Sequence, residues 1–244
     1  MSVRLWAVIP AAGVGRRMGG GDRPKQYRQL LDRPVIAWAL ERLLGHPRVA
    51  GAVVALAADD PYWEALRIQR GADQPVHRVD GGAERHDSVR AALAHLAAVA
   101  DGDDRVLVHD AVRPCLSAAE LDRLITEGGE AADGALLATP VRDTLKRADG
   151  AERVAETVPR DGLWQAQTPQ LFPLGRLAEA LDAALAAGAG VTDEAQAVER
   201  HGGRPRLVTG EPSNLKITHQ ADLELAAAVL AAQRAATGRD EGPA

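Results

Sequence analysis

The chain has 244 residues, of which 46% are apolar and 26% are charged, and its formal net charge is -5 at pH 7. This size and composition allow one domain with a full hydrophobic core, and the negative charge argues against a nucleic-acid partner, which needs a basic surface. The single cysteine, Cys115, excludes an internal disulfide and a cysteine-rich metal site. No apolar run approaches the ~20 residues of a membrane span, so we expect a cytoplasmic protein without a membrane partner.

The chain opens with an apolar run over 5–10, which predicts a buried strand, and a glycine-spaced loop follows at once. Gly13 and Gly15 lack the Cβ atoms that would keep backbone N–H groups away from an anion. Basic residues then supply positive charge: Arg16, Arg17, Arg23 and Lys25. We interpret this loop as a polyphosphate site; the alternative is a flexible surface turn.

Two familiar phosphate-binding motifs do not fit this loop. A dinucleotide fingerprint needs a third glycine where the chain has Met18, and the acidic residue expected about 20 residues later is missing. A P-loop needs Ser or Thr after its lysine, whereas Gln26 follows Lys25.

Beyond the loop, apolar spacing and turn residues predict alternating helices and strands. In chain order these are a helix over 35–44, a strand over 49–58, a helix over 62–69, a strand over 76–79, a helix resuming at 89, a strand over 105–109, a helix over 118–127 and a strand over 134–140. Asp87 or Ser88 is the predicted N-cap of the third helix, and Ser117 with Glu120 forms a capping box for the fourth.

This alternation predicts an α/β fold of the Rossmann-like kind: an open, mostly parallel, twisted sheet with helices on both faces. Ligands of such sheets bind beyond the carboxyl ends of the strands. The first loop, the Gly81-Gly82 turn, Asp110 and Arg113 all follow predicted strands, so we expect them to converge at one edge.

The pattern changes over 139–160, where two polar segments flank the turn Asp149-Gly150. A two-stranded ribbon of this kind is marginal in water by itself, so we expect a protruding β-hairpin arm that is exchanged in a homodimer. Later elements are helices near 174–187 and 192–201, strands over 206–209 and 214–218, and a closing helix over 221–236. We expect one domain over 1–236, a flexible tail over 237–244 and no second catalytic domain behind it.

Chemistry at a polyphosphate requires charge neutralisation around the phosphates rather than a protein nucleophile. We therefore suggest that Arg17 and Lys25 stabilise the phosphates of the ligand. The backbone N–H groups of 11–15 would hold this ligand. Asp110 is placed to meet Mg²⁺ or a substrate hydroxyl, although it could instead cap the turn over 111–114. Arg113 suits the second substrate, and His109 is expected to be a packed strand-end side chain.

Several motifs in order resemble the 2-C-methyl-D-erythritol 4-phosphate cytidylyltransferase family, within the nucleotidyltransferases that make nucleoside-diphospho sugars and alditols. They are Pro10-Ala-Ala-Gly-Val-Gly-Arg-Arg-Met18, Pro24-Lys-Gln-Tyr27, Asp80-Gly-Gly82 with Arg85 and Asp87-Ser-Val89, Val108-His-Asp-Ala-Val-Arg-Pro114, Pro140-Val-Arg-Asp-Thr144 with Lys146, Leu163-Trp164 with Thr168-Pro-Gln170, Thr192-Asp-Glu-Ala195 and Asn214-Leu-Lys-Ile-Thr218.

The resemblance implies an enzyme that joins CTP to a sugar-alcohol phosphate with the help of Mg²⁺, and it implies roles for individual residues. The implied catalytic residues are Arg17, Lys25, Arg160 and Lys216. The implied nucleotide-binding residues are Pro10, Ala11, Ala12, Gly13, Val14, Gly15, Gly81, Gly82, Ser88, Asp110 and Ala111, of which Gly82 and Ser88 would read the cytosine. The implied substrate-binding residues are Asp110, Arg113, Thr144, Arg160, Thr168 and Lys216, with Arg160 and Thr168 completing the neighbouring subunit's site.

Two alternatives remain open from the sequence. One is a cytidylyltransferase for another alditol phosphate, such as ribitol 5-phosphate, and Asp143, Thr144 and Arg160 are the positions that would discriminate. The other is a non-catalytic nucleotide-binding regulator, for which loss of Lys25 or Lys216 would be the sign; both are present.

Overall fold

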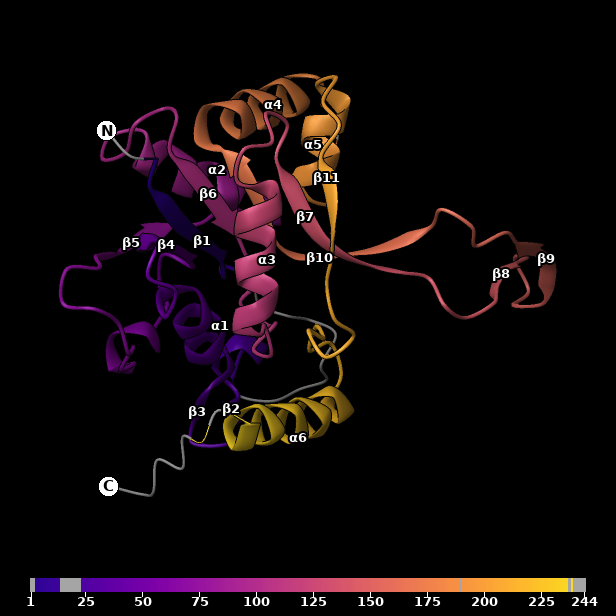
Figure 1. The fold of residues 1–244 in the computed structure, drawn as a ribbon, viewed down its shortest axis with the longest axis horizontal. Helices are drawn as coiled ribbons and strands as arrows, with labels where there is room; N and C mark the ends of the chain where they lie inside the picture. Colours follow the sequence, from indigo (N-terminus) through magenta and orange to yellow (C-terminus); the bar gives the residue numbers. More distant parts are fainter. Residues whose placement is uncertain (1–2, 14–22, 189, 237, 239–244) are drawn as a thin grey trace.

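The fold was analysed in a computed structural model, which describes residues 3–13, 23–188, 190–236 and 238. Within these residues a seven-stranded sheet has the strand order β11-β7-β10-β6-β1-β4-β5 (Figure 1). Its strands are β1 (Leu5–Pro10), β4 (Val49–Leu56), β5 (Val76–Asp80), β6 (Arg105–Val108), β7 (Ala135–Pro140), β10 (Trp164–Pro173) and β11 (Arg206–Thr209). A short ribbon pairs β2 (Gln29–Leu30) with β3 (Arg33–Pro34).

The predicted mostly parallel sheet is confirmed, with one antiparallel strand inside it. β1 pairs in parallel with β4 and β6, β4 with β5, and β7 with β11. β10 runs antiparallel to both β6 and β7, because the chain returns through it after the arm. The carboxyl ends of β1, β4, β5 and β6 therefore lie along the same edge of the sheet.

Side chains alternate along β1 and bury both faces of the sheet. Leu5, Ala7 and Ile9 pack on the side covered by α1 (Val35–Leu44) and α3 (Ala118–Gly128). Trp6 and Val8 pack on the other side, against α2 (Arg85–Leu96), α4 (Leu174–Ala186) and α5 (Glu194–Arg200). This gives the predicted layer of helices on each face.

The last helix, α6 (Gln220–Ala236), closes a separate apolar cluster beside the sheet. Cys115 is buried in this cluster, and its Sγ lies 3.7 Å from the carbonyl oxygen of Ala226 on α6. Burial raises the pKa of the Cys115 thiol to about 12. The thiol is therefore a packed apolar group.

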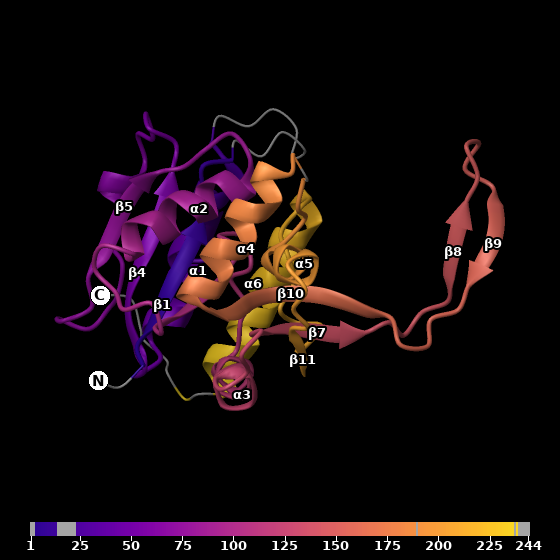
Figure 2. The ribbon, with the colours of Figure 1, turned by 90° about the horizontal axis from the view of Figure 1, so that it is seen from above.

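The predicted arm is present. β7 and β10 continue beyond the sheet and lead to a hairpin of β8 (Leu145–Ala148) and β9 (Val154–Val158), which stands well away from the body (Figures 1 and 2). Val154 on β9 is 66% exposed, and the arm residues that face solvent include Leu163 and Trp164. Exchange of this arm between two subunits stays a prediction.

Three local predictions were wrong. The segment 62–69 forms only the 3-10 turn η3 (Trp63–Ala65). The Asp60 carboxylate accepts hydrogen bonds from the Tyr62 and Trp63 N–H groups at its start, but the backbone becomes extended at Leu66. The segment 214–218 is not a strand, and its Ile217 N–H donates to the Val112 carbonyl. The N-cap of α2 is Glu84, and Asp87 lies in the first turn.

In the described part of the chain no helix combines the length and the apolar character needed to cross a bilayer.

Candidate active site

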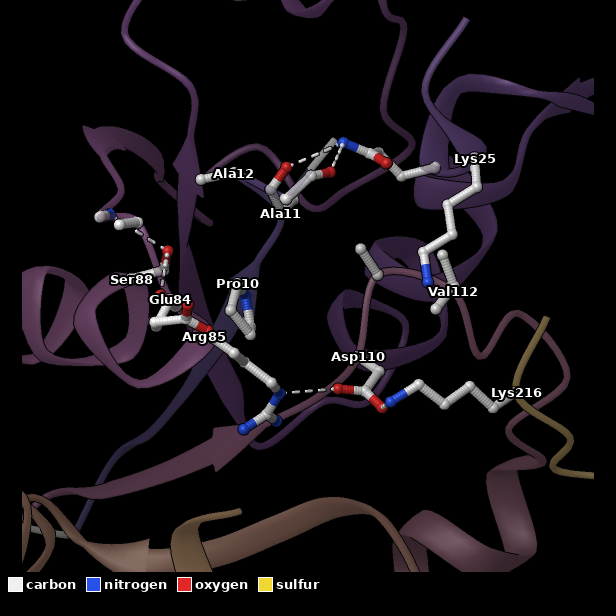
Figure 3. A pocket seen from close by; sticks show the side chains of 15 residues that line it. Pro10, Ala11, Ala12, Lys25, Glu84, Arg85, Ser88, Asp110, Val112 and Lys216 are labelled. Carbon is white, nitrogen blue, oxygen red and sulfur yellow. Dashed lines mark hydrogen bonds and ion pairs between the residues drawn. The ribbon is translucent and has the colours of Figure 1, made fainter. Parts of the chain in front are cut away.

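A pocket of about 280 Å³ opens at the carboxyl ends of β1, β5 and β6 (Figure 3). It lies where the fold predicts a ligand, and the chain segments that form it are far apart in sequence. Its lining residues are Pro10, Ala11, Ala12, Gly13, Lys25, Gln26, Gly82, Ala83, Glu84, Arg85, Ser88, Asp110, Ala111, Val112 and Lys216.

The first loop leaves β1 in an anchored conformation. The Ala11 N–H donates to the Ala55 carbonyl at 2.8 Å, which continues the pairing of β1 with β4. The side chain of Gln26, in η2 (Lys25–Tyr27), is buried and donates from Nε2 to the carbonyl oxygens of Ala11 at 2.9 Å and Gly13 at 3.3 Å. These contacts tie the start of the loop to the turn that carries Lys25, which reaches toward the same cavity (Figure 3).

The opposite wall is the turn between β5 and α2. The Gly82 N–H donates to Ser88 Oγ at 3.2 Å, and this hydroxyl can donate to the Glu84 carbonyl at 3.3 Å. A Cβ on Gly82 would lie 2.2 Å from the Asp87 Cβ, so this close turn requires glycine. At its two glycines the turn therefore presents backbone groups to the cavity, beside the Ser88 hydroxyl.

The floor of the pocket is a charged cluster around Asp110, which is buried at the end of β6. Arg85 Nε lies 3.0 Å from Asp110 Oδ1, and Lys216 Nζ lies 2.9 Å from Oδ2, on the other side of the carboxylate (Figure 3). Arg113 Nε lies 3.6 Å from Oδ2. Burial alone would raise the pKa of Asp110, but the charges of Arg85, Lys216 and Arg113 outweigh it and hold this pKa far below its ordinary value.

Behind Asp110, a buried hydrogen-bond chain fixes its backbone. The Asp110 N–H donates to Thr168 Oγ1 at 3.0 Å, and this hydroxyl contacts His109 Nδ1 at 2.9 Å. His109 Nε2 contacts the Arg113 carbonyl at 2.9 Å. Because a carbonyl only accepts, Nε2 carries the proton and Nδ1 accepts from Thr168. Burial lowers the pKa of His109 to about 4, so the imidazole is neutral and structural, as the sequence suggested.

The segment that carries Lys216 is tied to the same framework. Asn214 is fully buried; its Nδ2 donates to the Thr168 carbonyl at 2.9 Å, and its own carbonyl accepts from Arg113 Nη1 at 2.6 Å. The Ile217 N–H donates to the Val112 carbonyl at 2.9 Å. Lys216 therefore lies between Asn214 and Ile217, both of which are anchored by hydrogen bonds.

The structure brings most of the predicted site residues together. Those that line the pocket are Pro10, Ala11, Ala12, Gly13, Lys25, Gly82, Ser88, Asp110, Ala111 and Lys216. Gly81 packs directly behind them, since a Cβ there would lie 2.6 Å from the Ala12 Cβ. Arg113 and Thr168 support Asp110 from outside the lining.

Other predicted residues lie elsewhere. Thr144 and Arg160 flank the β8–β9 hairpin and are exposed on the arm, and they do not line the pocket of their own chain. The Arg160 guanidinium donates to the Arg142 carbonyl. Val14, Gly15 and Arg17 lie outside the described residues.

The sequence interpretation gave no role to Gln26, Arg85 or Glu194. Gln26 anchors the first loop, and Arg85 joins Asp110 to Glu194, which is buried at the start of α5. The sequence does carry a signal for the pocket lysines that were predicted: only three of the 29 lysines and arginines are lysines, at positions 25, 146 and 216, and two of these line the pocket. In a chain that uses arginine almost everywhere, a lysine marks a position where a compact ammonium is wanted.

The residues that the structure describes do not form a cage for a resident metal ion. Among the described residues no group of three or more His, Cys, Asp or Glu side chains is placed to hold one. The pocket contains the carboxylates of Glu84 and Asp110, and each Asp110 oxygen already faces a cation within 3.0 Å. A site for Mg²⁺ normally leaves carboxylate oxygens open to the ion.

A second hollow of about 430 Å³ lies between α1, α3 and α6. Its basic side chains are engaged with their neighbours: Arg33 pairs with Glu41 at 2.6 Å, and Arg234 pairs with Asp32 at 2.8 Å. These guanidinium groups also lie 4.9 Å and 4.5 Å from the ring centre of Trp38. The cluster joins helices, and we assign it no ligand.

Comparison with known proteins agrees with this geometry. The family profile of 2-C-methyl-D-erythritol 4-phosphate cytidylyltransferase matches residues 5–232. A protein of that name from Halorhodospira halophila is 80% identical over 239 residues, covering 98% of each chain, and one from Ectopseudomonas mendocina is 54% identical over 224 residues, covering 91% of this chain and 94% of the relative.

Solved structures agree in fold as well. A crystal structure of 4-diphosphocytidyl-2C-methyl-D-erythritol synthase superposes with a TM-score of 0.80 at 39% identity, covering 94% of this chain and all of the other. The 2-C-methyl-D-erythritol 4-phosphate cytidylyltransferase from Francisella tularensis gives a TM-score of 0.78 at 33% identity, covering 93% of this chain and 99% of the other. The pocket, the sheet and these similarities lead to one conclusion: the chain belongs to the 2-C-methyl-D-erythritol 4-phosphate cytidylyltransferase family.

Proposed function

We propose that this chain is a cytidylyltransferase of the non-mevalonate isoprenoid pathway. It joins CTP and 2-C-methyl-D-erythritol 4-phosphate to give 4-diphosphocytidyl-2-C-methyl-D-erythritol and pyrophosphate, the activity of the family to which it belongs. The observation that carries the assignment is the pocket in which Lys25 and the first loop face the Asp110 and Lys216 pair across one cavity.

The chemistry needs no covalent intermediate with the protein. A phosphate oxygen of the methylerythritol phosphate attacks the α-phosphorus of CTP, and the bond from this phosphorus to the bridging oxygen of pyrophosphate breaks. Negative charge grows on the leaving pyrophosphate and is spread over the α-phosphate oxygens. Lys25, Lys216 and Arg17 are the proposed cations for these charges, because fixed positive groups stabilise the transition state without reorganising.

Nucleotide recognition is assigned to the two walls of the pocket. The backbone of Pro10 to Gly15 is proposed to hold the nucleotide, and the Gly81-Gly82 turn with Ser88 to read the cytosine. Their support is the anchored backbone over 10–13 and the close Gly82–Ser88 contact. Asp110 and Ala111 complete the floor.

The second substrate is assigned to Asp110, Arg113 and Lys216, with a contribution from the arm of another subunit. Thr144 and Arg160 on the exposed arm are proposed to complete the neighbour's site in a homodimer. Thr168, expected to do the same, is instead buried against Asp110 of its own chain. The support is that these arm residues lie away from the pocket of their own chain. In this proposal 1–236 is one nucleotidyltransferase domain, and 139–160 is its dimerisation arm.

We propose that Mg²⁺ binds together with the nucleotide. Phosphate oxygens and water supply most ligands of Mg²⁺ in nucleotide sites, so no dedicated protein cage is required. Asp110 is the carboxylate proposed to reach the ion.

The test is pyrophosphate release measured with four nucleoside triphosphates, each combined with methylerythritol phosphate and with ribitol 5-phosphate. We expect release with CTP and methylerythritol phosphate alone. Preference for ribitol 5-phosphate would replace the acceptor in this proposal, and CTP binding without release in any combination would favour the non-catalytic regulator.

A further inference from the structure

The Arg85 guanidinium lies between two buried carboxylates that belong to different parts of the fold. Its Nε lies 3.0 Å from Asp110 Oδ1, at the end of β6. Its two Nη atoms face Glu194, with Nη1 to Oε1 at 2.5 Å and Nη2 to Oε2 at 3.1 Å. Glu194 is only 1% exposed, so this paired contact excludes water on its side.

Glu194 itself is held at the start of α5 by contacts from β10. The Ala195 N–H donates to Gln170 Oε1 at 2.8 Å, and Gln170 Nε2 donates to Asp193 Oδ2 at 3.0 Å. Asp193 caps the helix by accepting from the Gln196 N–H at 2.9 Å. The Glu194 carboxylate is thus fixed by the fold before any substrate binds.

The geometry of a guanidinium explains how the fixed Glu194 carboxylate affects the contacts of Asp110. Arginine presents its N–H groups in a rigid fork, so the edge that faces Glu194 cannot also face Asp110. In this orientation Nε is the atom that is hydrogen-bonded to Asp110, and it contacts one oxygen, Oδ1. Oδ2 stays available to Lys216, whose Nζ lies 2.9 Å away.

We infer that Glu194 is a positioning residue: it holds Arg85 so that one oxygen of Asp110 is left for Lys216. Without the Glu194 charge, the guanidinium is free to turn and contact both Asp110 oxygens, which displaces Lys216 from the place where it meets the acceptor phosphate. The catalytic part of this inference rests on the proposed function; the placement of Lys216 does not.

The kinetic test is Glu194→Gln, which keeps the shape of the side chain and removes its charge. We expect kcat to fall roughly 10- to 100-fold, as when the support of a catalytic group is lost, and the KM for methylerythritol phosphate to rise. The KM for CTP should not rise, because removing a negative charge beside the pocket favours the triphosphate. A variant that only loses folded protein would lower kcat and leave both KM values unchanged, and that result would overturn the inference.

Two sets of variants sharpen the kinetic test. Asp104→Asn is the matched control, because Asp104 is also a buried carboxylate paired with an arginine, Arg4, but precedes β6 at the opposite end from Asp110. Both of its KM values should equal those of the unaltered protein. The double variant Arg85→Gln/Glu194→Gln should lose no more activity than Arg85→Gln alone; additive losses would show that Glu194 does not act through Arg85.

A second readout needs no turnover. Because the chain has three lysines, labelling with an amine-reactive reagent can be followed at each one by mass spectrometry, with Lys146 on the arm as internal reference. In Glu194→Gln, Lys216 should label at least several-fold faster relative to Lys146, whereas Asp104→Asn should leave this ratio unchanged. An unchanged ratio in Glu194→Gln overturns the inference. If the ratio rises while the unaltered protein releases no pyrophosphate, the placement of Lys216 stands and the proposed function fails.

Discussion

The charge of Asp110 depends on its three basic neighbours, and these neighbours are not equivalent. Arg85 contributes a planar group already engaged on its other edge by Glu194. Lys216 contributes a compact ammonium on a flexible stem, and its side chain is 41% exposed to the pocket. A group of this kind can leave Asp110 and follow a phosphate, whereas a forked guanidinium held on two sides cannot.

Lys216 is therefore the first residue to test by substitution. We expect Lys216→Ala to lower kcat by about 100- to 1000-fold, the usual cost of removing one electrostatic contact to a transition state. Lys216→Arg should restore little of this loss, because a planar guanidinium does not reproduce the compact ammonium group. Circular dichroism and a thermal melt serve as the control for folding, and near-normal turnover by Lys216→Ala would contradict the assigned role.

At the scale of single elements, local sequence patterns predicted those helices that are set by their own apolar spacing and end residues. α1 follows from apolar spacing and from Pro34 and Gly45 at its ends, and α3 follows from the Ser117 and Glu120 capping box that the structure contains. The segment 62–69 has apolar residues at suitable positions but is not a helix, because after η3 the Gln69 N–H donates to the Glu41 carboxylate on α1. That partner lies 28 residues away and cannot be read from the local pattern.

The same distinction applies to the candidate site. Residues that directly follow a strand, such as Gly82 and Asp110, could be placed at the sheet edge from the order of elements alone. The pairing of Arg85 with Glu194 spans 109 residues and depends on how α5 packs against the sheet. The resemblance to the family supplied Lys216, because the local pattern of its segment predicted only a strand over 214–218, which the structure does not contain.

The junction between β6 and β10 gives a prediction at this scale. Thr168→Val removes the hydroxyl that accepts from the Asp110 N–H and donates to His109, and it leaves two buried groups without partners. We expect the free energy of unfolding to fall by about 1–3 kcal/mol in denaturant titrations. Thr168→Ser keeps the hydroxyl and should retain most of the stability; equal losses in the two variants would show that packing of the methyl group, rather than the hydrogen bonds, is what Thr168 contributes.

At the scale of the whole molecule, the arm makes a prediction about shared sites. If Arg160 serves the neighbouring subunit, neither Arg160→Ala nor Lys216→Ala homodimers contain a complete site. Mixed dimers contain one complete site, so co-refolding the two inactive variants should restore about a quarter of the normal activity. Sedimentation confirms that dimers have formed, and absence of recovery in mixed dimers would place Arg160 outside the neighbour's site.

Stability against acid depends in part on Asp104, which joins the beginnings of β1 and β6. Burial would raise the pKa of Asp104, but hydrogen bonds from the N–H groups of Arg4 and Asp101 and from the side chains of Trp6 and Arg4 lower it below the ordinary value of 3.8. A carboxylate with a depressed pKa stabilises the fold above its unfolded pKa and loses this effect as the pH falls through the folded pKa.

Asp104→Asn should therefore lower the free energy of unfolding at pH 7 by about 1–3 kcal/mol. The difference from the unaltered protein should shrink as the pH falls below about 4, since Asp104 is protonated there first in the unfolded chain and then, at lower pH, in the folded protein. Urea titrations at several pH values check this, and a difference independent of pH would mean that the Asp104 charge has no part in the effect.

The lone thiol of Cys115 has a practical consequence. The Cys115 thiol is covered by α6, and its pKa is raised to about 12. An aromatic disulfide reagent that releases a coloured thiolate should therefore react with this thiol only when α6 moves away. The colour released on reaction then times the opening of one helix in the otherwise intact protein. Val112 and Ile217, which contact each other beside the pocket, belong to the same apolar cluster as Cys115. The reaction rate of Cys115 therefore reports how substrate binding changes the opening of α6.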